Sequence, residues 1–153
     1  MAQPDDAARM VEVGGKEITA REAVAEARVT MTPEACRRLL VGTPKGDPIE
    51  AARVAGLMAA KRTPDLLPFC HPVALTGAEV SITSDAQAGV LRVRASVRAA
   101  DRTGVEMEAL TAVSVAALSL YDTAKAYDRG VVIGEIRLLE KRGGRSGDHG
   151  SPG

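Results

Sequence analysis

The stretch AEVSITSDAQAGVLRVRASVR, residues 78–98, alternates apolar and polar side chains on both sides of a polar turn. In its first half Ala78, Val80 and Ile82 alternate with polar residues, and in its second half apolar residues occupy every second position from Leu91 to Val97. A period of two is typical of a strand with one buried face, and the polar residues 84–89 predict a hairpin turn. The stretch therefore predicts two strands of an antiparallel sheet that is covered on one side.

Upstream of this hairpin the sequence predicts two helices. A hydroxyl residue followed by proline starts the first helix, which we expect over residues 32–41. Asp47 and Glu50 form a capping box at the start of the second helix, with aspartate in place of the usual serine or threonine. The Thr63-Pro64 pair ends or bends this second helix, because proline disfavours helical backbone at the residue before it.

The remaining segments complete an α+β pattern. Residues 22–31 alternate with a period of two and predict a strand, residues 9–13 predict a further short strand, and residues 131–140 predict the last one. Residues 105–128 carry an apolar stripe at helical spacing and predict a long helix. The resulting order β-α-α-β-β-α-β predicts a ferredoxin-like antiparallel sheet with helices packed on one face.

We expect one domain over residues 1–153, since its length suits a single core, with flexible ends at 1–8 and 143–153.

The composition argues against several classes of protein. Lys plus Arg and Asp plus Glu number 20 each, and the resulting zero net charge argues against a nucleic-acid partner. No apolar run reaches the roughly 20 residues that span a bilayer, and no leader opens the chain, so we expect a cytoplasmic protein without a membrane partner. Two cysteines form no disulfide framework, and we find no metal or cofactor motif.

Cys70 and His71 are the first residues that could carry chemistry. The pair is a poor metal site, because zinc usually takes four ligands and the other ligands are missing. Adjacent residues on an extended strand point to opposite faces, so we expect Cys70 to be structural and His71 to be the functional candidate. A histidine satisfied by hydrogen bonds within a loop is the alternative, and the residues alone do not decide between the two.

Two further candidates lie near helix starts. Lys45 directly precedes a predicted helix N-terminus, a position that favours anions, but from this segment alone a surface lysine in a capped loop is the better explanation. Glu106 and Glu108 open the long helix, where carboxylates also complement the helix dipole. They lie about 200° apart around the helix axis, so we expect only one of them, Glu108, to face a small ligand.

Asp122 and Lys125 are spaced i and i+3 on the long helix. They form either an acid–base couple or a surface ion pair. Glu108 and Asp122 lie roughly 21 Å apart along that helix, so one subunit can hardly bring both to one small reacting group. A site shared between subunits, or a long ligand, would resolve this.

Taken together, these segments resemble the MoaC family, the cyclic pyranopterin monophosphate synthases. The resemblance rests on KGD (45–47), AAKRT (59–63), CHP (70–72), TGVEMEALTA (103–112), Tyr121-Asp122 with Lys125, IRLLEK (136–141) and GGRSG (143–147). It covers nearly the whole chain in one order. Departures such as Glu12, Phe69 and Tyr127, where the family commonly has other residues, remove no polar group of the expected site.

The resemblance implies a function and a set of site residues. The family converts (8S)-3',8-cyclo-7,8-dihydroguanosine 5'-triphosphate, made by a radical GTP-cyclising enzyme, into cyclic pyranopterin monophosphate and diphosphate during molybdenum cofactor biosynthesis. It implies a homohexamer, a trimer of dimers, with sites at subunit interfaces and no cofactor. The implied residues are Asp122 as acid–base group with Lys125 beside it; Phe69, Cys70, His71, Met107 and Glu108 lining the substrate; and Lys45, Lys141 and Arg145 on phosphate. An inactive nucleotide-binding regulatory subunit remains the alternative, and an interaction scaffold is the weakest.

Overall fold

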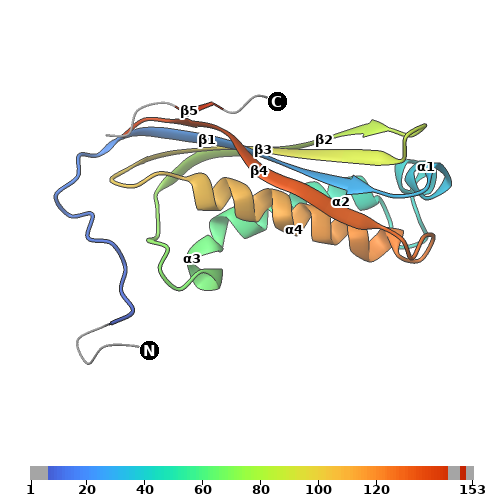
Figure 1. The fold of residues 1–153 in the computed structure, drawn as a ribbon, viewed down its shortest axis with the longest axis horizontal. Helices are drawn as coiled ribbons and strands as arrows, with labels where there is room; N and C mark the ends of the chain where they lie inside the picture. The colour runs from blue at the N-terminus through green and yellow to red at the C-terminus, as the bar shows by residue number, and fades with distance from the viewer. Residues whose placement is uncertain (1–6, 145–148, 151–153) are drawn as a thin grey trace.

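The sheet is antiparallel throughout, with strands in the order β2-β3-β1-β4-β5 (Figure 1). The computed structural model of the chain describes residues 7–144 and 149–150. The elements are β1 Thr19–Thr30, α1 Pro33–Val41, α2 Pro48–Lys61, α3 Thr63–Leu66, β2 Leu75–Asp85, β3 Val90–Asp101, α4 Glu106–Ala124, β4 Val132–Arg142 and β5 His149–Gly150. The order β2-β3-β1-β4 is that of a ferredoxin-like fold, which confirms the predicted α+β class.

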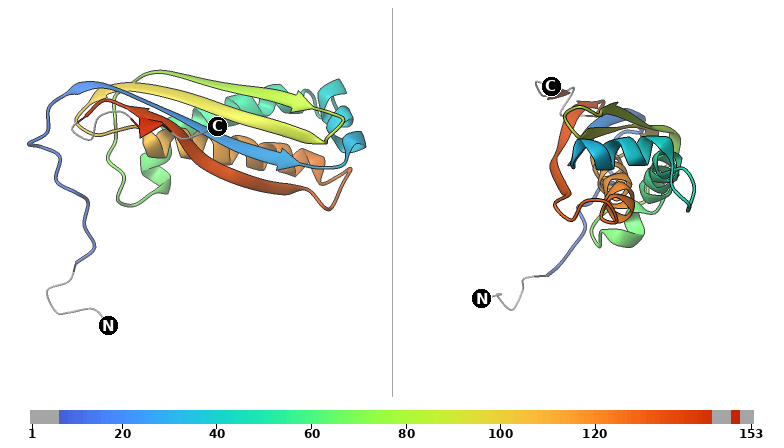
Figure 2. Two further views of the ribbon diagram at one scale, coloured as in Figure 1. Left: turned by 45° about the horizontal axis from the view of Figure 1, so that its top comes forward. Right: turned by 90° about the vertical axis from the view of Figure 1, so that its right-hand side faces the viewer.

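The helices lie on one side of this sheet, as the end-on view in Figure 2 shows. α4 packs against β1, β3 and β4, while α2 packs against β2 and α4. On β1 the alternate residues Ala23, Ala25, Ala27 and Val29 are fully buried and face the helices. The alternation that predicted strands therefore also predicted which face of the sheet carries the core.

Helices α1 and α2 begin at the capping residues from which we predicted their starts. Thr32 Oγ1 accepts a hydrogen bond from Ala35 N at 3.2 Å, which caps α1. Asp47 Oδ1 accepts from Ile49 N at 2.9 Å, which caps α2. Each cap satisfies amide groups that have no partner within the helix.

Two predictions about the backbone were wrong. Residues 9–13 form no strand: within the described chain, residues 7–18 contain neither helix nor strand. The long helix ends at Ala124 rather than at residue 128. After Ala124 the backbone forms a tighter turn, in which Tyr127 N donates a hydrogen bond to Ala124 O, three residues back, at 2.8 Å. The side chain of Asp128 accepts a hydrogen bond from Thr32 N at 2.9 Å.

The ends expected to be flexible lie partly outside the described residues. Within the second of them, β5 pairs with Glu140 and Lys141 of β4. Among the described residues, no helix is long and apolar enough to cross a membrane.

Candidate active site

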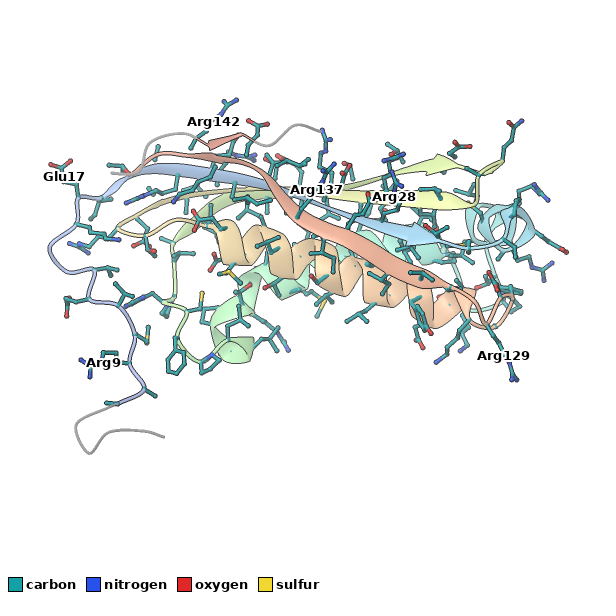
Figure 3. The ribbon with its side chains drawn as sticks, viewed as in Figure 1. Arg9, Glu17, Arg28, Arg129, Arg137 and Arg142 are labelled. Carbon is teal, nitrogen blue, oxygen red and sulfur yellow. The ribbon has the colours of Figure 1, made fainter. Side chains whose placement is uncertain are left out.

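The expected site residues gather at the two opposite ends of α4. We call the N-terminal end, with residues 69–71 and 106–108, the closed end, and the C-terminal end, with Lys45, Asp122 and Lys125, the open end. In Figure 3 the closed end lies on the side of Glu17, and the open end lies on the side of Arg129. Arg145 lies outside the described residues.

A cavity of about 240 Å³ occupies the closed end. Phe69, Cys70, His71, Met107 and Glu108 all line it. These five residues come from the loop after α3 and from the first turn of α4, segments that are distant in the sequence. The structure thus brings together half of the residues that the sequence nominated.

Asp101, at the end of β3, holds the loop that carries Cys70 and His71. Its Oδ2 accepts a hydrogen bond from Ala74 N at 2.8 Å, and its Oδ1 accepts one from Arg102 N at 2.7 Å. These bonds, the one from Ala74 first, lower the pKa of Asp101, so its carboxylate is stable in this position. The loop residues 70–74 are irregular rather than a strand. Consequently our argument that Cys70 and His71 face opposite sides was wrong, and both line the cavity.

Glu108 is a buried carboxyl group, 1% exposed, at the inner wall of the cavity. Its Oε2 lies 3.6 Å from Sγ of Cys70, within hydrogen-bonding range for sulfur. Burial raises the pKa of Glu108, outweighing the hydrogen bonds from its own backbone amide and from Cys70. Burial and the neighbouring Glu108 raise the pKa of the Cys70 thiol to about 11.

Glu106 lines the same cavity as Glu108, contrary to our expectation that only one of them faces a ligand. The two side chains still point about 200° apart around the helix axis. In the first turn, however, no earlier turn of helix lies between them, so both can reach the same cavity. Gly104 permits this, because a Cβ at that position would collide with the Glu106 carboxyl group. Lys141 Nζ lies 3.6 Å from Glu106 Oε1, which brings the expected phosphate contact Lys141 to the closed end.

One wall of the cavity was not expected from the sequence. Val11, Val13 and Lys16 line it from the N-terminal segment that precedes β1. Val11 and Val13 belong to residues 9–13, which we expected to form a strand. Lys16 adds a cation beside the acidic first turn of α4.

The open end holds an exposed ion pair. Lys125 Nζ lies 2.7 Å from Asp122 Oδ1, and their side chains are 59% and 74% exposed. The hydrogen bond and charge of Lys125 lower the pKa of Asp122, and the charge of Lys45 lowers it further. Lys45 is carried by a tight loop between α1 and α2, in which Gly46 adopts a φ of 116° that favours glycine. The three charged residues are therefore close in space, as a shared role requires.

This arrangement places proton-transfer groups at both ends of α4 and cations beside each. The closed end offers a buried carboxyl, a thiol and an imidazole around one cavity. The open end offers a carboxylate with two lysines, and the loop that carries Lys45 lines a cavity of about 400 Å³ there. Among the described residues, no three His, Cys, Asp or Glu side chains lie close enough to hold a metal ion.

Comparisons with known proteins place the chain in a family. The model of the MoaC family matches residues 10–144. The cyclic pyranopterin monophosphate synthase of Parvibaculum lavamentivorans is 56% identical over 94% of this chain and 90% of its own length. Those of a Roseiflexus species and of Chloroflexus aurantiacus are 57% and 56% identical over 92% and 95% of this chain, each over 90% of their own length.

Proposed function

Since this chain belongs to the MoaC family, we propose that it is a cyclic pyranopterin monophosphate synthase, a lyase of molybdenum cofactor biosynthesis. It converts (8S)-3',8-cyclo-7,8-dihydroguanosine 5'-triphosphate to cyclic pyranopterin monophosphate and diphosphate. The observation that carries this proposal is the identity of 56% or more, over at least nine-tenths of both chains, with relatives that bear this name. The enzyme works in the cytoplasm, downstream of a radical enzyme that cyclises GTP.

The chemistry of the reaction suits the groups at the two ends of α4. Ring opening, ring closure and formation of a cyclic phosphate need repeated proton transfers, for which Asp122, with Lys125 beside it, is the proposed acid–base couple. The triphosphate carries about four negative charges, which Lys45, Lys141 and Arg145 would neutralise.

The other five of the ten proposed site residues lie at the closed end and hold the pterin-forming part of the substrate. They are Phe69, Cys70, His71, Met107 and Glu108. Their shared cavity of about 240 Å³ supports this assignment. His71 is half-buried there and can hydrogen-bond the substrate or move a proton.

The distance between the two ends argues for a site shared by two subunits. Glu108 and Asp122 are separated by about 21 Å along α4, too far for one small reacting group. In a symmetric dimer the open end of one subunit can complete the closed end of its partner, and three such dimers give the proposed homohexamer. Purified protein that remained monomeric in solution and fully active would contradict the shared site.

Turnover tests the function directly. Purified protein would be incubated with the cyclised dihydro-GTP, and both diphosphate release and the fluorescent pterin formed by oxidising the product would be measured. We expect turnover by the parent protein and its loss in Asp122→Asn. Tight binding of the substrate without turnover would favour a regulatory subunit. Absence of both binding and turnover would overturn the proposal.

A further inference from the structure

We propose that Cys70 is a positioning residue for the reaction, acting through Glu108: its thiol donates a hydrogen bond that holds the buried carboxyl group and sets the pH at which that group exchanges its proton. This inference rests on the proposed function, because it concerns a proton transfer in that reaction. It assigns to Cys70 neither a nucleophilic nor a metal-binding role.

The geometry of the pair carries the inference. The thiol sulfur lies 3.6 Å from Oε2 of Glu108 and 3.7 Å from the backbone oxygen of His71, so both of its hydrogen-bond acceptors are at the cavity. Glu108 is 1% exposed, which leaves its carboxyl group few partners other than this thiol and its own backbone amide. A buried carboxyl group with so few donors depends strongly on each of them.

The thiol is protonated at neutral pH and can donate its hydrogen. With its pKa raised to about 11, almost none of Cys70 is thiolate under physiological conditions. A protonated thiol is a weak nucleophile and a poor metal ligand, but it retains the hydrogen that the carboxyl group accepts. The pairing thus explains why a cysteine at a cavity wall is compatible with chemistry that uses no covalent intermediate on sulfur.

The charged groups near Glu108 are of two kinds: carboxylates that disfavour its ionised form, and cations elsewhere at the closed end. Glu106 on the same helix and Asp101 at the end of β3 both raise the pKa of Glu108, after burial as the largest cause. The cations at this end include Lys16, on the cavity wall, and Lys141, which is paired with Glu106. Arg21 and Arg102 lie at the same end and lower the pKa of Asp101 by their charge. His71 completes the titratable groups of the cavity. Among the described residues, Cys70 is therefore the one side chain whose hydrogen bond to Glu108 favours the charged form.

The pH dependence of turnover tests this role with a matched pair of variants. Cys70→Ala and Cys70→Ser leave nearly the same space, but only serine keeps a donor. Without the donor the pKa of Glu108 rises further, so the limb of the kcat profile due to Glu108 lies at higher pH in Cys70→Ala than in Cys70→Ser. This direction holds whether Glu108 gives or takes the proton. We expect KM to change by a similar factor in both variants, because both remove the sulfur from the cavity, and kcat at neutral pH to be partly restored by serine.

A limb at the same pH in both variants, with equal losses of kcat, would overturn the positioning role. A role in packing alone would give that result, since both variants lose the same bulk.

Alkylation of the thiol tests the pairing without any turnover. At a pKa of about 11 rather than 9.0, loss of thiolate outweighs the gain in intrinsic nucleophilicity, so Cys70 should react with iodoacetamide about tenfold more slowly than an ordinary thiol. Glu108→Gln should accelerate the reaction, as followed by mass spectrometry of the Cys70 peptide, with the fully buried Cys36 as the internal control for unfolding. An unchanged rate would overturn the pairing, whereas absence of turnover in the parent protein would overturn only the proposed function.

Discussion

The two ends of α4 carry similar chemical groups in opposite surroundings. At the closed end the carboxyl group of Glu108 is 1% exposed, within a cavity walled by three segments of the chain. At the open end Asp122 pairs with Lys125 in contact with solvent, with a side chain that is 74% exposed. The hydrogen bond within this pair lowers the pKa of Asp122 and raises that of Lys125, while water weakens the contribution of such an exposed pair to stability. The difference teaches that the chain buries one of its proposed proton-transfer groups and leaves the other in contact with solvent.

The largest effect that we expect concerns turnover at the closed end. Glu108→Gln keeps the size of the side chain but removes its exchangeable proton, so kcat should fall by about 10²- to 10⁴-fold, the usual contribution of a general acid or base. Steady-state kinetics would measure it, with Glu50→Gln as the control, because Glu50 forms an exposed ion pair with Arg53 on α2. Activity close to that of the parent protein would remove Glu108 from the site.

The next effect concerns substrate affinity at the open end. Lys45→Ala removes a cation from the triphosphate, and a lost charged hydrogen bond should raise KM by about 10- to 100-fold. Arg37→Ala on α1 removes the same charge from an exposed position at this end and should leave KM unchanged. Equal effects of the two substitutions would mean that only the general field of the protein matters.

A third, smaller effect concerns the pH dependence of the free energy of unfolding, to which the buried Glu108 of the closed end contributes. Because burial raises the pKa of Glu108 in the folded state, its favourable contribution is complete below its ordinary pKa of 4.5 and is lost as pH rises through the folded value. Glu108→Gln should therefore gain stability relative to the parent protein between pH 4 and pH 8, as urea unfolding would show. A difference that is constant across this range would contradict the buried carboxyl group.

The smallest effect concerns the stability of the open end. Asp122→Asn and Lys125→Gln break an ion pair in contact with water, which seldom stabilises a fold measurably. Thermal unfolding midpoints should match that of the parent protein, while turnover is lost. A marked fall in either midpoint would show that this pair is structural.

Strands β1 to β4 and the starts of α1 and α2 could be predicted from the sequence because local patterns indicate them. Alternation at 78–98 gave β2 and β3, and hydroxyl or carboxyl caps gave the starts of α1 and α2. The strand predicted at residues 9–13 was wrong, because so short a segment carries no signal for the presence of a partner strand; Val11 and Val13 line the cavity instead.

The site was predicted residue by residue, but its surroundings were not. Spacing along α4 correctly separated Glu108 from Asp122, since a helix has a fixed rise. Burial of Glu108, its contact with Cys70 and the anchor at Asp101 all depend on segments 27 or more residues apart meeting at one end of the sheet. The roles of the ten nominated residues stay predictions until activity is measured.

A mixture of two inactive variants tests the central claim, that the two ends of α4 from different subunits form one site. Glu108→Gln and Asp122→Asn would be co-expressed with different tags, and the oligomers carrying both would be purified and assayed. Each two-fold symmetric pair of mixed subunits then holds one site with both substitutions and one with neither, so random mixing should restore about a quarter of the parent activity. If both residues of a site came from the same chain, every site would carry one substitution, and a mixture as inactive as either variant alone would contradict the account.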